Sequence, residues 1–217
     1  MPKDLANYLD IWGNMQTTEL RAFVEGLDTA LTARYKQPNK WKTADLDALP
    51  DDEREELRYR NPDGGFAARD DFPRLGRHVA FVGIVAFFEH KLFSLRERCR
   101  KIQAVSLDVK KNQWGADEAK KCFKKELDIS LAQNNAAWER LLTYVHIRNL
   151  VVHGDSRVPD FKDLTSERYE KFERSVQLTQ PIDVNSVGQF TLSREYCLKS
   201  IDHIESYFQD DLLPLLP

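Results

Sequence analysis

The chain reads Tyr-Val-His-Ile-Arg-Asn-Leu-Val-Val-His-Gly-Asp-Ser-Arg from Tyr144 to Arg157. This stretch continues a segment, starting at Trp138, that is apolar on most sides, as is typical of a buried helix. Four polar side chains interrupt the segment at spacings of seven, three and four residues, which places them on one stripe of an α-helix: Glu139, His146, Asn149 and His153. Burying such groups is costly unless they are hydrogen-bonded. The stripe therefore belongs either to a satisfied structural network or to a functional site.

The end of this helix is marked by Gly154, which directly follows His153. Glycine is favoured in the left-handed position just past a helix end, so we expect His153 in the last turn with an accessible imidazole. Arg148 lies beside the stripe, about 140° around a regular helix from His153. Its long side chain would have to fold toward the helix end for the two groups to meet.

The order Arg148-Asn149, three residues and His153 resembles the signature of the HEPN superfamily, in which an Arg and a polar residue precede a His near a helix end. An earlier long helix with adjacent Glu89 and His90, and a helical remainder, are similar to that family over most of the chain. The resemblance implies an all-α helical bundle that forms a homodimer and, in catalytic members, cuts RNA without a metal or cofactor. It also implies that Glu89 or His90 supports the motif helix. Alternatively, the pair only marks where the long helix becomes exposed.

The motif suits RNA cleavage because an RNA phosphodiester carries its own nucleophile, the adjacent 2′-hydroxyl. His153 can transfer a proton near neutral pH, Arg148 can stabilise the crowded phosphate, and Asn149 can orient either group. One histidine cannot act as base and acid at the same instant. A two-fold dimer would supply the second imidazole, and so would His146 within the same chain. A third interpretation is that His153 only caps carbonyl groups at the helix end.

The resulting functional hypothesis is a metal-independent endoribonuclease of the toxin or antiviral-defence kind, with a composite site at the dimer interface and a 2′,3′-cyclic phosphate product. An antitoxin or sensor protein would be a natural partner for such an enzyme. The alternative is a non-catalytic HEPN-like module for dimerisation or for binding RNA or protein.

Composition is compatible with one globular domain over residues 1–217: 41% of residues are hydrophobic, 31% are charged, and the net charge is −3. The three cysteines are widely spaced, which argues against a disulfide framework and a zinc site. The N-terminus lacks a secretory signal, and no uninterrupted apolar run approaches the length of about 18 residues that a bilayer requires. We therefore expect a cytoplasmic protein with no membrane partner.

Charge is segregated along the chain. Residues 37–72 are rich in Pro and turn residues, and 44–71 hold ten Asp or Glu against four Arg. This segment is either a solvated acidic connector or a lid that repels nucleic acid. Residues 96–125 carry a net charge of +6. Either they form a solvated helix face, or they bind RNA phosphates through a basic patch: Lys110, Lys111, Lys120, Lys121, Lys124 and Lys125.

The remaining elements follow from periodicity and turn signals. Apolar spacing predicts long helices over about 4–35 and 73–104, the second buried on nearly every side because 79–88 is continuously apolar. An appendage over 155–192 should contain a loop, a charged helix from Thr165 to about Leu178, and a small β-hairpin around Asn185-Ser186-Val187-Gly188. Ser193 should begin the last helix. The predicted fold class is all-α, with this hairpin before the final helix.

Overall fold

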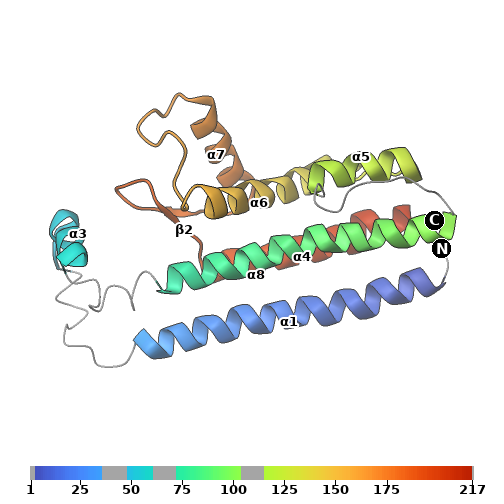
Figure 1. The fold of residues 1–217 in the computed structure, drawn as a ribbon, viewed down its shortest axis with the longest axis horizontal. Helices are drawn as coiled ribbons and strands as arrows, with labels where there is room; N and C mark the ends of the chain where they lie inside the picture. Colours follow the sequence, from blue (N-terminus) through green and yellow to red (C-terminus); the bar gives the residue numbers. More distant parts are fainter. Residues whose placement is uncertain (1–2, 36–47, 61–71, 104–114, 217) are drawn as a thin grey trace.

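Helix α4 (Phe72–Gln103) lies at the centre of the fold, as the apolar run from Val79 to Phe88 predicts. The computed structural model describes residues 3–35, 48–60, 72–103 and 115–216, and these are mostly helical. α4 runs beside α1 (Lys3–Tyr35) and α8 (Arg194–Ser206) along the length of the molecule (Figure 1). The prediction of an all-α fold is confirmed.

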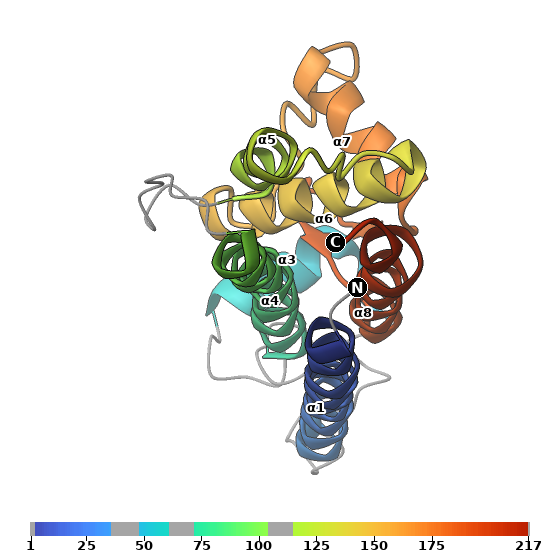
Figure 2. The same cartoon turned by 90° about the vertical axis from the view of Figure 1, so that its right-hand side faces the viewer.

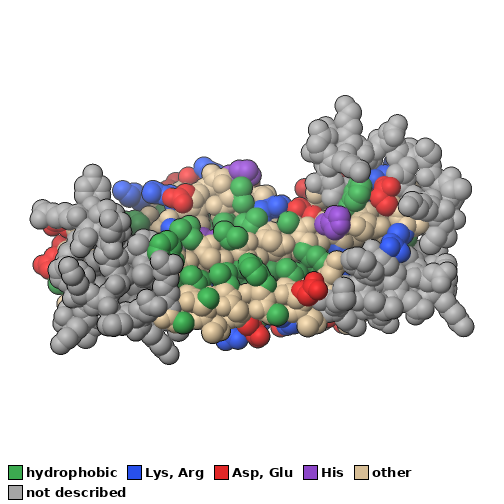
Figure 3. All heavy atoms as spheres, turned by 60° about the horizontal axis from the view of Figure 1, so that its bottom comes forward, with side chains coloured by type: hydrophobic (Ala, Val, Ile, Leu, Met, Phe, Trp, Pro, Cys, Tyr) green, Lys and Arg blue, Asp and Glu red, His purple; other side chains and the backbone are tan. Residues whose placement is uncertain are grey.

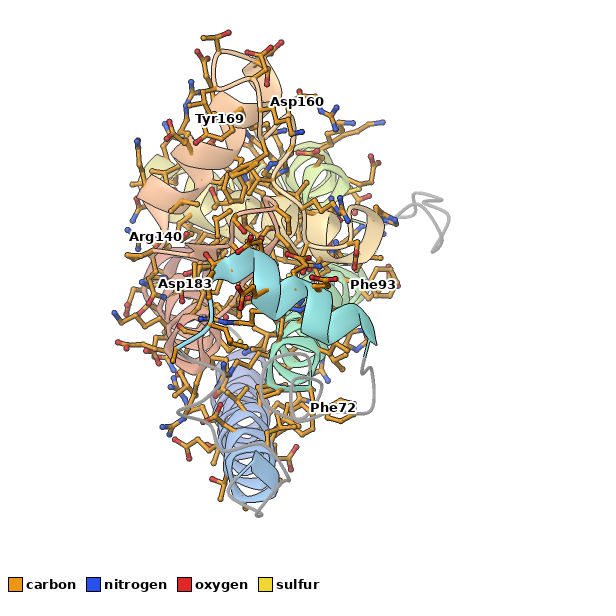
Figure 4. The ribbon with its side chains drawn as sticks, turned by 90° about the vertical axis from the view of Figure 1, so that its left-hand side faces the viewer. Phe72, Phe93, Arg140, Asp160, Tyr169 and Asp183 are labelled. Carbon is orange, nitrogen blue, oxygen red and sulfur yellow. The ribbon has the colours of Figure 1, made fainter. Side chains whose placement is uncertain are left out.

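Helix α6 (Asn135–His153) crosses the layer formed by α4 and α8 obliquely, as the end-on view in Figure 2 shows. Helix α5 (Ala116–Leu127) packs on α4 beside α6, and α7 (Glu167–Leu178) packs on α6. Figure 4 shows Asp160 and Tyr169 at the end of the molecule farthest from α1, beside α7. α6 therefore has a core-facing side against α4 and α8 and an outer side between α5 and α7.

Large side chains from these helices form one core. Phe81 lies edge-on to both Tyr144 and Tyr196, so α4, the middle of α6 and the first turn of α8 meet at one aromatic cluster. Fully buried members of the core come from all three helices: Phe81, Ile84, Phe88, Leu92, Trp138, Leu141, Tyr144, Ile147, Tyr196 and Ile201. Fully burying a large apolar side chain contributes about 1.5–3 kcal/mol, so this cluster fixes the path of α6.

Helix α1 is joined to the other helices by ion pairs as well as apolar contacts. Arg77 of α4 donates two hydrogen bonds to Asp28, and Arg21 pairs with Asp202 and Glu205 of α8. A Cβ atom at Gly76 would lie 2.8 Å from the Leu31 side chain, so the glycine permits the close approach of α4 to α1. α1 thus packs on α4 and α8, opposite to α6.

One prediction about α4 is wrong. The helix is not buried on nearly every side, because Leu75 and Val79 are 46% and 66% exposed. Figure 3 shows a band of hydrophobic side chains on this outer surface, over α1 and α4. By length and composition alone, α4 is also apolar enough from Phe72 to Cys99 to cross a membrane. The core helix of a globular protein passes the same test.

The chain after α6 forms the predicted appendage of loop, helix and hairpin. α7 begins at the N-cap Ser166, and strands β1 (Asp183–Val184) and β2 (Phe190–Thr191) pair antiparallel. Gly188 adopts a positive φ of 77° in the turn, where a Cβ atom would collide with Phe161. Ser193 caps α8 as predicted, and the chain continues through a π-helical segment, Tyr207–Leu212, and a 3₁₀ turn, Leu213–Leu215.

The acidic segment is described only over residues 48–60. There the chain forms helix α3 (Asp51–Arg60), and three acidic residues occupy its first turn. Acidic side chains stabilise a helix N-terminus through the helix dipole. Residues 37–47 and 61–71 lie outside the described residues, so the choice between connector and lid remains a prediction.

Candidate functional site

The motif helix α6 ends at His153, as the sequence predicts, but the residues that follow have a different conformation from the one expected. Gly154 has φ of −113° and is not left-handed; Asp155 and Ser156 have positive φ values of 50° and 58° instead. A Cβ atom at position 154 would lie 2.9 Å from the carbonyl oxygen of Leu150. The glycine is therefore needed because the backbone approaches the last helical turn closely.

The polar stripe of α6 lies on the outer side of the helix, and its side chains are exposed or half-buried. Glu139, His146 and Asn149 line a groove of about 750 Å³ that α6 forms with α5 and α7. His153 is exposed one turn beyond Asn149 and does not line this groove. The stripe is thus accessible, and His146, not His153, shares the groove with Arg148.

Arg148 is anchored by Glu89 of α4. Its Nη2 atom donates to both carboxylate oxygens of Glu89, at 3.0 and 3.1 Å, and the two side chains are 20% and 16% exposed. Burial raises the pKa of Glu89, and the neighbouring Arg148 opposes that rise. The Nε atom of Arg148 is buried without a hydrogen-bond partner. The guanidinium is therefore oriented by one carboxylate while retaining a donor for another acceptor.

Of the two supporting residues suggested on the second long helix, Glu89 contacts the motif helix. His90 is exposed, and its Nε2 atom lies 3.4 Å from Ser94 Oγ on the same helix. A carboxylate can compensate a half-buried guanidinium, and Glu89 supplies one. For His90, the alternative interpretation applies: this residue only marks where α4 becomes exposed.

His146 is half-buried, and its Nε2 atom has no hydrogen-bond partner. Burial lowers the pKa of this imidazole, and the nearby positive charge of Lys171 lowers it further. A neutral imidazole can accept a proton, so His146 has the chemistry of a general base. It remains the rival to His153 for that role.

The lysines of the predicted basic patch are exposed where the structure describes them. Lys120, Lys121, Lys124 and Lys125 project from α5, while Lys110 and Lys111 lie outside the described residues. Two of the four are in local ion pairs, Lys121 with Glu118 and Lys124 with Asp128. The start of the same helix, including Asp117 and Glu118, lines the groove. The patch therefore lies beside the groove, and RNA binding by it stays a prediction.

Two basic residues of the groove were missed at the sequence level, Lys171 and Arg174 of α7. They lie three residues apart, which places them on neighbouring positions of one helix face. α7 was predicted only as a charged helix, because nothing in its own sequence shows which helix it packs against. The groove depends on this tertiary contact.

A second, smaller pocket of about 270 Å³ lies between α4 and the end of α6. Its lining includes exposed Val79 and Val152 and buried His78. The Nδ1 atom of His78 lies 2.9 Å from Ser156 Oγ, while Nε2 has no hydrogen-bond partner. His78 therefore contacts the loop that follows the motif helix.

We expect His78 to make the protein less stable in acid. Burial, with a smaller contribution from Arg74, lowers the pKa of His78 from 6.5 to about 4. Between these values the unfolded state binds a proton that the folded state does not, so the free energy of unfolding falls as the pH drops from about 6.5 to 4. The loss is about 3 kcal/mol from this group. Urea denaturation at several pH values should show a steeper acid loss in the wild type than in His78→Gln; parallel pH curves would contradict the assignment.

Within the described parts of the chain, no three His, Cys, Asp or Glu side chains are grouped so that they could hold a metal ion. Cys99, Cys122 and Cys197 are all buried as free thiols.

Comparison with known proteins identifies no relative: no family model, curated protein or solved structure matches this chain. The similarity to HEPN proteins therefore rests on the motif residues and their order.

Proposed function

We propose that this chain is a metal-independent endoribonuclease that acts as a homodimer, with Arg148, Asn149 and His153 at its catalytic site. The observation that supports this most is the exposure of the motif. Asn149 and His153 are open to solvent on one stripe, and Glu89 orients Arg148 behind them. A network saturated by internal contacts would have left these groups unable to reach RNA.

In the proposed reaction, one imidazole removes the proton from a ribose 2′-hydroxyl, whose oxygen attacks the adjacent phosphorus. Arg148 donates to the non-bridging oxygens as their charge increases. A second imidazole protonates the departing 5′-oxygen. The products are a 2′,3′-cyclic phosphate on one fragment and a 5′-hydroxyl on the other, so no water or metal is consumed in this step.

The second imidazole is supplied, in this proposal, by His153 of another copy. The exposed apolar side chains of α4, Leu75 and Val79, lie next to Val152, which immediately precedes His153. Exposed apolar patches of this kind are typical of association surfaces. A two-fold axis through this surface would bring two motif-helix ends together.

Incubation of the purified protein with end-labelled RNA in the presence of EDTA tests the activity. We expect cleavage to persist and the 5′ fragment to end in a cyclic phosphate, which acid converts to a mixture of 2′- and 3′-monophosphates. Cleavage that requires a divalent cation, or a 3′-hydroxyl product, would refute this reaction.

The proposed dimer surface predicts that Val79→Glu produces a monomer with at least tenfold lower cleavage at a fixed protein concentration. A buried, unpaired carboxylate would oppose association at a surface that is apolar in the wild type. Because Val79 is 66% exposed, the monomer itself should fold normally. Analytical ultracentrifugation gives the oligomeric state.

The matched control is Val187→Glu, which places the same charge at a valine that is 48% exposed on the hairpin turn. It should remain dimeric and active. A wild-type monomer, or equal behaviour of the two variants, would rule out this surface.

The second candidate function is a non-catalytic module that dimerises or binds RNA or protein. The Glu89–Arg148 ion pair favours it, since a paired guanidinium between two helices also has a structural role. Binding of RNA without cleavage, unchanged by His153→Ala, would support this module. Neither candidate identifies a controlling antitoxin or sensor protein.

A further inference from the structure

The groove across α6 has walls of opposite charge. α7 contributes Lys171 and Arg174 on one side, and the first turn of α5 contributes Asp117 and Glu118 on the other. Glu139, His146 and Asn149 of α6 form its floor. At about 750 Å³, the groove is large enough for a small organic ligand or one unit of a polymer.

The cationic groups of the α7 wall have no partner within the described parts of the chain: neither the Lys171 side chain nor the Arg174 side chain forms an ion pair or a hydrogen bond there. Next to them are two unsatisfied buried atoms, His146 Nε2 and Arg148 Nε. Buried polar atoms usually have hydrogen-bond partners, so unpartnered ones beside two free cations indicate a place for an anionic group with several acceptor oxygens. A phosphate diester has these properties.

The acidic wall excludes a ligand that is anionic along its whole length. Asp117 is exposed and Glu139 lies on the floor, and neither side chain is in an ion pair among the described residues. Carboxylates accept hydrogen bonds from exocyclic amino groups of nucleobases, as they do from the amino group of cytosine. A nucleotide has a phosphate at one end and a base at the other, so it matches both walls.

We propose that this groove binds one nucleotide of single-stranded RNA, with its phosphate against Lys171 and Arg174 and an amino-bearing base against Asp117 and Glu139. Single strands are the natural ligand because their bases are free to turn into a pocket. The position of the bound nucleotide relative to the cleavage site rests on the proposed function. Asn149 lies in the groove one helical turn before His153, so the bound nucleotide is next to the scissile bond. The groove thereby selects the base next to the cleavage site.

The test measures binding separately from cleavage. Short 2′-O-methyl oligocytidylate and oligouridylate lack the nucleophilic hydroxyl, so fluorescence anisotropy reports affinity alone. They differ at the base edge, where cytosine has a 4-amino group and uracil has a 4-carbonyl oxygen and an N3–H. We expect the wild type to bind oligocytidylate at least fivefold more tightly than oligouridylate. The double variant Lys171→Gln/Arg174→Gln should weaken binding of both ligands at least tenfold and reduce the slope of log K against log salt by about one.

Two further variants make the result specific. Lys199→Gln removes an exposed lysine of α8 outside the groove and should bind like the wild type. Asp117→Asn/Glu139→Gln should reduce the preference for cytosine over uracil while retaining affinity for uracil. Circular dichroism and thermal melting confirm that each variant is folded.

The inference would be overturned if the α7 double variant bound like Lys199→Gln, if the wild type bound neither oligonucleotide, or if cytosine gave no preference. Failure of the proposed function looks different. A wild type with groove-dependent, cytosine-preferring binding that leaves unmodified RNA intact would disprove catalysis and support the groove.

Discussion

Replacing His153 with alanine is expected to reduce the rate of RNA cleavage by about 10²–10⁴-fold, the usual contribution of a positioned general acid or base. His153 is exposed at the end of α6, so its removal should leave the fold and the stability unchanged. Single-turnover cleavage of a labelled RNA, with saturating protein, measures the chemical step without the contribution of binding. Binding of a 2′-O-methyl oligonucleotide should stay within about twofold of the wild type.

The decisive control is His146→Ala, since His146 lies in the groove with Arg148 and has a depressed pKa. If His153 is the catalytic histidine, His146→Ala should retain most of the activity. The reverse result, an inactive His146 variant beside an active His153 variant, would move the catalytic role into the groove and remove the need for a second copy.

The largest effect on stability is expected from Glu126→Ala, which should lower the free energy of unfolding by about 3–5 kcal/mol, the usual cost of leaving a buried charge unpaired. Arg96 of α4 donates two hydrogen bonds to Glu126 of α5, at 2.8 and 2.6 Å, and both side chains are 1% exposed. Glu126→Ala would remove the two short hydrogen bonds that the buried Arg96 guanidinium donates; Glu97, at 3.4 Å, is a more distant and partly exposed carboxylate. Urea denaturation measures the change.

Two controls identify the cause of that loss. Lys124→Ala breaks an exposed ion pair with Asp128 on the same helix and should have no measurable effect. The double variant Arg96→Met/Glu126→Leu replaces the buried pair with apolar side chains and should recover most of the stability. A Glu126→Ala variant as stable as Lys124→Ala would mean that the pair does not hold α5 on α4.

The sequence predicted where the motif helix ends because that end is encoded locally, by Gly154 directly after His153. The start was not predicted; there Asn134 caps the helix and accepts a hydrogen bond from the Ala137 amide. The periodic polar stripe also showed that His146 and Asn149 share one face. The left-handed conformation was assigned to the wrong residue, because the loop after α6 is shaped by distant contacts, including that of Ser156 with His78.

The residues of other helices that surround the polar stripe of α6 could not be predicted from the sequence. Charge alone did not distinguish Glu89 from His90 as the partner of Arg148, since that choice depends on how α4 is rotated against α6. Lys171 and Arg174 reach the groove only because α7 folds back over α6. The exposed strip at Val79 was missed because a continuous apolar run gives no periodic signal that one side of the helix is exposed.

The loop after the motif helix is tied to the hairpin by hydrogen bonds. The Phe190 amide donates to the Ser156 carbonyl oxygen, and the Gln189 side chain donates to that of Asp155. Isolated helix ends fray because their last carbonyl groups lack partners. By bracing the backbone that leaves α6, the hairpin limits fraying and so narrows the range of positions open to the His153 imidazole. The hairpin, more than thirty residues downstream, thus supports the end of the motif helix. Shortening its turn should widen the range of positions of the His153 imidazole.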